Sequence, residues 1–208
     1  MITADSIANI LIKSGYYVQA SKTKDKIIKT PNGDIVPAYL SCRLAISNVE
    51  DREKIEEELT KKVKLEFGDD ITIVGMATAG ITWAHAIAQS LKMPLIYIRS
   101  SEKEYGLKGL IEGDIEKTYK KAIIVDDILY TGNTINKAQK ILKEKGFEIV
   151  GVVCIATLRY KTVEQLKNQN IKVIDLTNYK NILEKARGNN ILNEEEYNIM
   201  KHIYEKNE

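Results

Sequence analysis

The segment from Ala122 to Thr134 places two adjacent acids, and then a small hydroxyl-rich turn, directly after an apolar run. Residues 122–125 are short, apolar and β-branched, which predicts a buried strand of an α/β sheet. Asp126 and Asp127 then fall at the carboxyl end of this strand, where open α/β sheets bind their ligands. Two carboxylates at this place suit the hydroxyls of a ribose and, directly or through water, a hard divalent cation such as Mg²⁺.

The turn after the acids is predicted to open a helix. Apolar residues recur at helical spacing from Ile135 to Leu142, so residues 130–134 sit at a helix N-terminus. Unpaired backbone N–H groups and the helix dipole favour an anion there, and hydroxyl groups add further donors. The string thus predicts a site for a sugar phosphate, formed by Asp126, Asp127, Ile128, Leu129, Tyr130, Thr131, Gly132, Asn133 and Thr134. No lysine follows the glycine, which argues against a P-loop nucleotidase.

A second candidate loop spans residues 75–81, between a predicted strand and a predicted helix. The small residues Ala77, Thr78, Ala79 and Gly80 would let backbone amides approach a ligand closely, and a pyrophosphate group suits such a loop. In isolation this is an ordinary strand-to-helix turn. Its position one βαβ step before the acidic pair favours the functional interpretation, because the two loops can then face one substrate.

A third candidate is the long loop from Arg99 to Gly113, which contains three glycines and six charged residues. A loop of this length without its own structure is usually functional or disordered. We expect a mobile lid that excludes water and brings Arg99 and Lys103 to a departing pyrophosphate.

The order of elements predicts an α/β fold with a central, mostly parallel sheet flanked by helices. Helices are expected up to Gly15 and over 50–66, 80–91, 134–145 and 162–168, with two more at the C-terminus, and strands over 71–74, 95–98, 122–125, 148–155 and 171–174. An Asn-Gly pair within residues 26–34 predicts a hairpin. We expect a single domain over residues 1–208, with 70–175 as its core. Residues 1–45 and about 176–208 are expected to form a small hood and flanking helices.

Composition narrows the class of protein. The 208 residues carry a formal net charge of +2, which offers no electrostatic footprint for nucleic acid. No apolar run approaches the length of a membrane span, and the first residues lack the pattern of a signal peptide. A cytoplasmic location is therefore expected, with no membrane partner. Cys42 and Cys154 have no metal-type spacing and are expected to be free thiols.

The segment 122–134 resembles the motif with which type I phosphoribosyltransferases bind phosphoribosyl pyrophosphate (PRPP). From about residue 37 to 205 the chain resembles an orotate phosphoribosyltransferase, through Pro37-Ala38-Tyr39 with Arg43, the 77–81 loop, and Tyr97-Ile98-Arg99 running to Lys103, Gly106 and Glu112-Gly113. The resemblance implies transfer of phosphoribose from PRPP to orotate, giving orotidine 5-phosphate for pyrimidine synthesis. It also implies Mg²⁺ as cofactor and a homodimer that exchanges lids between subunits.

The resemblance assigns roles to individual residues. Lys103, Asp126 and Asp127 would be catalytic, and the two aspartates would hold the ribose hydroxyls and the metal. PRPP would contact Arg99, Lys103, Tyr105, residues 77–80 and residues 126–134, while Tyr130, Arg159 and Lys29 would face the base.

Three positions depart from the family pattern. Ser100 and Tyr105 stand where the lid usually has a lysine and a histidine, and Tyr130 stands where the turn usually begins with Thr or Ser. Two alternatives therefore stay open. One is a phosphoribosyltransferase for a different base, and the other is a non-catalytic regulator that senses PRPP.

Overall fold

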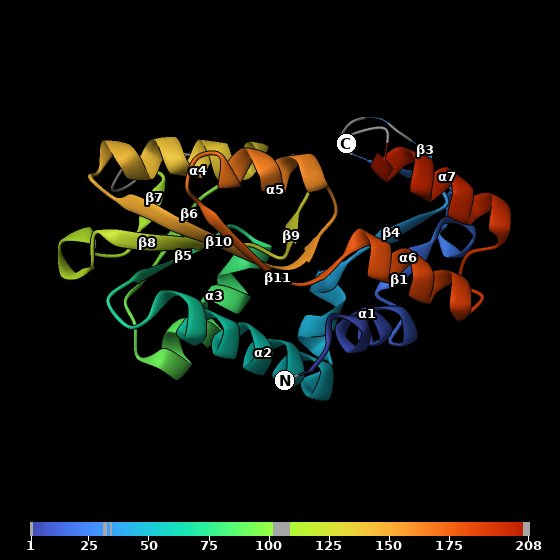
Figure 1. Ribbon diagram of the computed structural model, residues 1–208, viewed down its shortest axis with the longest axis horizontal. Helices are drawn as coiled ribbons and strands as arrows, with labels where there is room; N and C mark the ends of the chain where they lie inside the picture. Colours follow the sequence, from blue (N-terminus) through green and yellow to red (C-terminus); the bar gives the residue numbers. More distant parts are fainter. Residues whose placement is uncertain (1, 31–32, 34, 102–108, 206–208) are drawn as a thin grey trace.

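A computed structural model describes residues 2–30, 33, 35–101 and 109–205, and it divides into a sheet layered between helices and a smaller group of elements beside it (Figure 1). The described sheet has the strand order β11-β10-β8-β5-β6-β7, with β9 pairing to the end of β10. All neighbours are parallel except β6 and β7. The strands are β5 (Thr72–Met76), β6 (Leu95–Ile98), β7 (Ile111–Glu112), β8 (Lys121–Val125), β9 (Ile128–Leu129), β10 (Glu148–Thr157) and β11 (Lys172–Asn178).

Two pairs of helices cover the two faces of this sheet. α2 (Val49–Phe67) and α3 (Ala79–Leu91) lie on one face, and α4 (Asn133–Glu144) and α5 (Tyr160–Lys167) lie on the other (Figure 1). Alternating side chains of β8 serve both faces: Ile123 and Val125 belong to one buried cluster, and Ala122 and Ile124 to the other. The predicted α/β fold is thereby confirmed.

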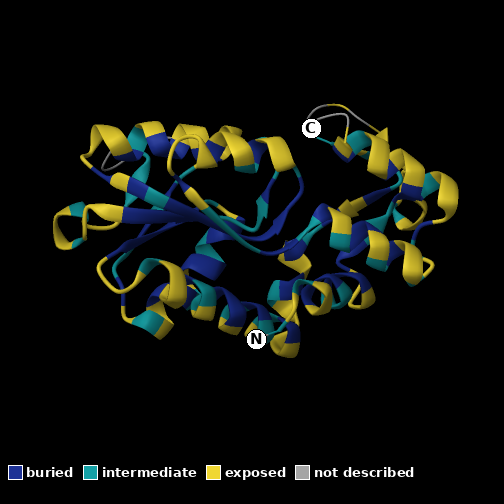
Figure 2. Cartoon of the chain, viewed as in Figure 1, coloured by how far each residue is buried: buried dark blue, intermediate teal, exposed yellow. Residues whose placement is uncertain are grey.

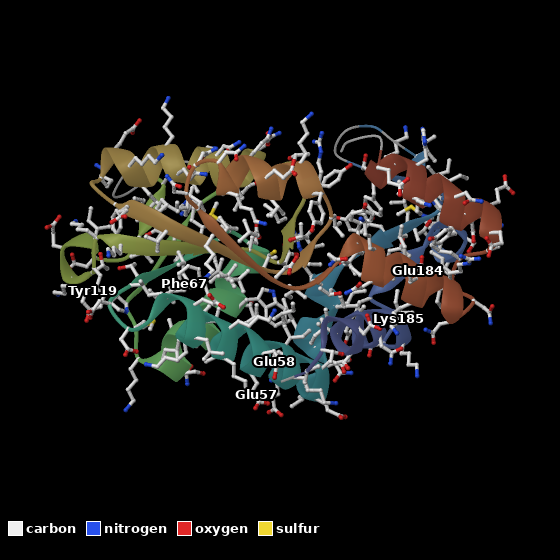
Figure 3. The ribbon with its side chains drawn as sticks, viewed as in Figure 1. Glu57, Glu58, Phe67, Tyr119, Glu184 and Lys185 are labelled. Carbon is white, nitrogen blue, oxygen red and sulfur yellow. The ribbon has the colours of Figure 1, made fainter. Side chains whose placement is uncertain are left out.

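The smaller group of elements, which we call the hood, combines both ends of the chain. It consists of α1 (Ala4–Lys13), β1 (Tyr17–Gln19), η1 (Ala20–Lys22), β2 (Ile28–Lys29), β3 (Ile35–Val36), β4 (Ala38–Leu40), α6 (Tyr179–Gly188) and α7 (Glu194–Glu205). β2 and β3 pair antiparallel, as the predicted hairpin requires, and β1 pairs with β4. α1 packs on α6, where Lys185 forms an ion pair with Asp5 at 2.8 Å. Figure 3 shows Lys185 and Glu184 on α6, at the end of the molecule opposite Tyr119.

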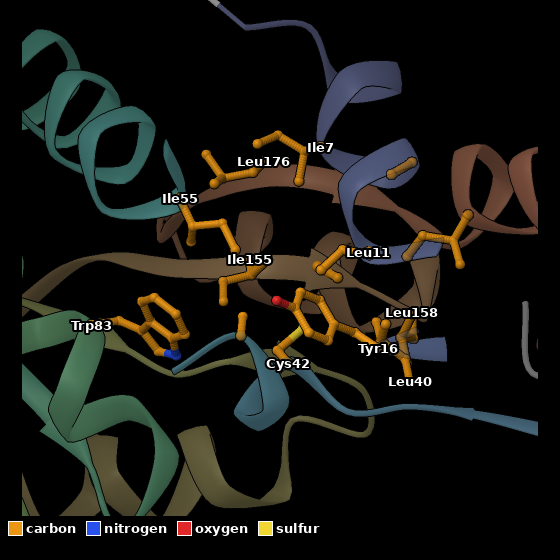
Figure 4. Packing of buried hydrophobic residues seen from close by; sticks show 14 of the residues in the cluster. Ile7, Leu11, Tyr16, Leu40, Cys42, Ile55, Trp83, Ile155, Leu158 and Leu176 are labelled. Carbon is orange, nitrogen blue, oxygen red and sulfur yellow. The ribbon is translucent and has the colours of Figure 1, made fainter. Parts of the chain in front are cut away.

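A 3-10 helix, η2 (Cys42–Ser47), joins the hood to α2, and a further one, η3 (Ile115–Lys117), precedes β8. The hood and the sheet share one buried cluster, shown in Figures 2 and 4. Close-up, the side chains of Leu11, Tyr16, Leu40 and Cys42 gather beside Ile155 and Leu158 of the sheet and its following loop. The Tyr16 hydroxyl also donates a hydrogen bond of 2.7 Å to the buried Asp51 carboxylate on α2. Packing and hydrogen bonding therefore fix the hood against the strand ends.

The predicted helices and parallel strands agree with the structure to within a few residues. The short strands β1, β4, β7 and β9 were not predicted, because runs of two or three residues leave no periodicity to detect. Cys42 and Cys154 are free and buried, as expected. Within the described residues, every helix falls short of the length and apolarity that crossing a bilayer needs.

Candidate active site

The carboxyl ends of the central strands meet the hood at a cavity of about 420 Å³. Loops after β5 and β8 form one side of this cavity, and β4, η2 and α7 form the other. The described residues that line it are Thr30, Val36, Ala38, Tyr39, Leu40, Arg43, Ala77, Thr78, Ala79, Asp126, Asp127, Ile128, Leu129, Tyr130, Thr131, Gly132, Asn133, Thr134, Ile135, Leu158, Met200, Ile203 and Tyr204. The predicted acidic pair, the turn after it and most of the 77–80 loop therefore share one cavity.

The acidic pair is held by its own backbone and by one cation. Asp126 Oδ1 accepts a hydrogen bond of 2.9 Å from the Asp127 N–H, and Asp127 Oδ1 accepts one of 3.0 Å from the Ile128 N–H. Arg43 Nε lies 3.8 Å from Asp127 Oδ2. Burial, and then the neighbouring charge of Asp127, raise the pKa of Asp126 to about 8. Two adjacent carboxylates in a partly buried cavity thus favour a cation or a hydrogen-bond donor beside them.

The turn after the acids presents a helix N-terminus to the cavity. Gly132 is the N-cap of α4, with a φ of 76°, and a Cβ there would lie 2.8 Å from Thr162 Cγ2. Thr162 Oγ1 donates a hydrogen bond of 2.6 Å to the Tyr130 carbonyl, which fixes the start of the turn. Residues 131–134, which form the start of α4, line the cavity, and the Asn133 N–H lies 3.5 Å from Thr131 Oγ1. A helix N-terminus with neighbouring hydroxyls is an arrangement that suits phosphate.

The 77–80 loop divides into residues that line the cavity and one that supports them. Ala77, Thr78 and Ala79 line it, and the peptide bond between Ala77 and Thr78 is cis. Gly80 is buried instead against the end of β8, where a Cβ would lie 2.3 Å from the Val125 carbonyl oxygen. The glycine thus allows α3 to begin next to the acidic pair. The structure places Gly80 under the site and not among the residues that line it.

The structure describes only the two ends of the predicted lid, residues 99–101 and 109–113. Arg99 follows β6, and its Nη1 lies 3.3 Å from Glu112 Oε1, so its guanidinium binds the far end of the same loop and is not among the described residues of the cavity wall. Lys137 on α4 donates a hydrogen bond of 3.2 Å to the Ser100 carbonyl. Lys103 and Tyr105 lie outside the described residues, and their roles stay predictions.

The carboxylates of Asp126 and Asp127 could bind Mg²⁺, but they do not by themselves supply all of its ligands. Among the described residues there is no group of three or more His, Cys, Asp and Glu side chains that could hold a metal ion. Mg²⁺ is commonly bound by one or two carboxylates together with waters and substrate phosphates. Asp126 and Asp127 supply such a pair.

Comparison with known proteins identifies the family. Residues 45–184 match the model of the phosphoribosyl transferase domain. The orotate phosphoribosyltransferase of Cytophaga hutchinsonii is 35% identical over 161 residues, which are 77% of this chain and 77% of that protein. The chain belongs to the orotate phosphoribosyltransferase family.

The folds of solved structures agree with this membership. The crystal structure of the orotate phosphoribosyltransferase from Aeropyrum pernix has a TM-score of 0.72 and 24% identity, covering 86% of this chain and 97% of that one. The Mycobacterium tuberculosis H37Rv orotate phosphoribosyltransferase in complex with PRPP has a TM-score of 0.61 and 16% identity, covering 86% and 98%. At these identities the likeness concerns the fold alone.

Of the three residues that the family resemblance assigned to the base, only Tyr130 is among the described residues of the cavity wall. Lys29 is exposed on β2, although the next residue, Thr30, lines the cavity. Arg159 is partly buried as the N-cap of α5, and its neighbour Leu158 lines the cavity. The contacts of Lys29 and Arg159 with a base stay predictions.

Sequence reasoning placed the C-terminal tail in the hood but named none of its residues at the site. Met200, Ile203 and Tyr204 of α7 line the cavity, about 70 residues after the acidic pair. Their spacing of three and four residues indicates an apolar helix face. That signal predicts a buried face but does not say which part of the chain the face covers.

Proposed function

We propose that this protein transfers the 5-phosphoribosyl group of PRPP to orotate, releasing pyrophosphate and forming orotidine 5-phosphate. The observation that supports it most strongly is the single cavity that joins the acidic pair to the N-terminus of α4. The first group suits the ribose hydroxyls, and the second suits a 5-phosphate. Membership of the orotate phosphoribosyltransferase family supports the same reaction.

The chain's own residues position the donor in this proposal. The N–H groups at the start of α4 and the hydroxyls of Thr131 and Thr134 hold the 5-phosphate, while Asp126 and Asp127 hold the ribose hydroxyls. Asp126 and Asp127 would hold Mg²⁺, which would neutralise charge on the pyrophosphate. The Ala77–Ala79 loop borders the pyrophosphate.

The bond changes are a substitution at C1 of the ribose. A ring nitrogen of orotate forms the new bond to C1 and gives up its proton to the departing pyrophosphate. The C1–oxygen bond to pyrophosphate breaks, and the leaving group takes the electron pair. Positive charge develops on the ribose, and the Asp127 carboxylate is placed to stabilise it, together with Asp126 when that residue is ionised. The hood closes the other side of the cavity and limits access of water, which would hydrolyse the donor.

Three further features belong to the proposal. Arg99, Lys103 and Tyr105 of the lid would contact the pyrophosphate, with Lys103 assisting its departure. The active form would be a homodimer whose lids reach into the neighbouring subunit, and the enzyme would act in the cytoplasm. The lid contacts and the homodimer are supported by the family resemblance, and the location by the sequence pattern.

The test is pyrophosphate release from PRPP with a panel of bases, each with and without Mg²⁺. We expect release with orotate only, and only when Mg²⁺ is present. Release with a different base would assign that base instead, whereas PRPP binding without turnover on any base would leave a PRPP sensor. Lys103→Ala should lower turnover by about 100-fold or more, because charge on the leaving group would lose its cation. Lys24→Ala, at an exposed hood position, serves as its control.

A further inference from the structure

The cavity has two sides with different origins. The side formed by residues 77–79, 126–135 and 158 lies within the segment 45–184 that matches the family model. The opposite side, formed by β4 and α7 of the hood and by Arg43 of η2, lies outside that segment. Since the acids and the α4 N-terminus account for the ribose and its phosphate, the hood side is left for the acceptor base.

Helix α7 presents one face to this space. Met200, Ile203 and Tyr204 are three and four residues apart, so they share a side of the helix, and all three line the cavity. Tyr204 is 7% exposed, and its ring lies 5.3 Å from the ring of Tyr179, measured between centroids, at an interplanar angle of 45°. This packing against α6 holds the Tyr204 ring in one position.

Tyr130 reaches the same space from the opposite side. It follows the acidic pair, lines the cavity and packs against the buried cluster that contains Tyr204. Burial raises the pKa of Tyr204 far above its ordinary value, and the hydroxyls of Tyr130 and Tyr39 contribute further. Tyr39, Tyr130 and Tyr204 thus line one cavity from three separate parts of the chain.

The size of the cavity limits what these rings can admit. Ligand cavities usually enclose about 300–1,000 Å³, and this one, at about 420 Å³, must hold a phosphorylated ribose as well as the acceptor. Close packing leaves little room to expand, because the Tyr204 ring is backed by Tyr179.

We infer that Tyr204 of α7 and Tyr130 form an aromatic wall that restricts the acceptor to a base with a single ring. The inference rests on the proposed phosphoribosyl transfer, whose acceptor it describes more closely. Shortening either side chain opens space next to the acceptor and admits a base with two fused rings. Tyr204 and Tyr130 act here as specificity-determining residues, without a part in bond making.

The experiment measures kcat/KM for orotate and for guanine, adenine and hypoxanthine, together with equilibrium binding of each base in the presence of PRPP. The variants are Tyr204→Ala, Tyr204→Leu, Tyr130→Ala and Tyr204→Phe. Tyr119→Ala is the matched control, because Tyr119 is 44% exposed and lies at the end of the sheet away from the hood (Figure 3). Thermal unfolding of each variant shows whether it is folded, and Tyr204→Leu keeps more of the apolar packing if Tyr204→Ala does not fold.

The wild type should reject all three two-ring bases. Tyr204→Ala, Tyr204→Leu and Tyr130→Ala should shift the ratio of two-ring base to orotate by at least about tenfold, since added pocket space changes discrimination by this order. Tyr204→Phe and Tyr119→Ala should keep the wild-type ratio. An unchanged ratio in the folded shortened variants would overturn the aromatic wall, as would a wild type that accepts a two-ring base.

The two proposals fail in different ways. A wild type that does not turn over orotate contradicts the proposed function. In that case the aromatic wall is still tested by comparing how the wild type and Tyr204→Leu bind one-ring and two-ring bases. A wild type that is active with orotate, alongside shortened variants with wild-type selectivity, contradicts only the wall.

Discussion

At the scale of single residues, the site contains two acidic side chains that are partly removed from water. Asp126 lies beside Asp127 in a cavity wall, and its pKa is raised to about 8, chiefly by burial. A protein that places two acids together for binding therefore carries a cost in stability until a ligand neutralises them. Natural binding sites often show this conflict between stability and function.

Asp126→Asn removes a carboxyl group whose ionisation makes the stability of the protein depend on pH. An unfolded Asp loses its proton near pH 4, whereas the folded Asp126 keeps it up to about pH 8. The folded state thus binds the extra proton between these values, so wild-type stability falls as pH rises through this window, by about 1.4 kcal/mol per unit of pKa difference at most. Asparagine stays neutral. The variant should gain thermal stability over the wild type as the pH is raised from about 5 to 8, without Mg²⁺ or PRPP.

Thermal unfolding at several pH values measures this difference. Asp25→Asn is the control, because residue 25 is exposed in the hood. A stability difference between Asp126→Asn and the wild type that is the same at every pH would contradict the burial of this carboxyl.

At the scale of elements, the site is built by bringing a helix start close to a strand end. α3 begins at Ala79, and Gly80 lies against the Val125 carbonyl at the end of β8. A side chain there has no room, since the atoms that it would meet are backbone. The contact sets the distance between the Ala77–Ala79 loop and the acidic pair.

Gly80→Ala should therefore destabilise the fold by about 1–3 kcal/mol, as insertion into a packed position does, and should weaken PRPP binding because the loop must shift. Gly188→Ala on α6 is the matched control: a Cβ at residue 188 meets no atom within 4 Å. Denaturant unfolding and PRPP titration report the two effects. Equal stability of the two variants would show that α3 is not held as closely to β8 as described.

Sequence patterns predicted the helices and the longer strands better than the tertiary contacts between them. The amphipathic helix α2 buries Ile55, Leu59 and Val63 at four-residue spacing, and this period can be detected in the chain without coordinates. The strand β9 (Ile128–Leu129) cannot be detected from periodicity, because it is only two residues long. Nor does any local period reveal that α7 lines the same cavity as the acidic pair. Such contacts depend on how distant segments pack, which spacing along the chain does not encode.

At the scale of the whole molecule, the hood and the sheet share one buried cluster. We propose that the chain is a single domain and unfolds as one cooperative unit. Calorimetry should then show one transition, with calorimetric and van't Hoff enthalpies that agree. Tyr16→Phe, which removes the hydrogen bond to Asp51, should lower the midpoint of that one transition. Two resolved transitions, with only one moved by Tyr16→Phe, would indicate separate units.

The proposed reaction requires the cavity between the strand ends and the hood to hold PRPP against orotate. The most direct measurement is the formation of orotidine 5-phosphate from PRPP, orotate and Mg²⁺, by the wild type and by the Asp126→Asn/Asp127→Asn double variant. The wild type should form this product in equal amount with pyrophosphate, and the folded double variant should lose at least about 100-fold in kcat/KM. A double variant as active as the wild type, or a wild type that binds PRPP and forms no orotidine 5-phosphate, would contradict the claim.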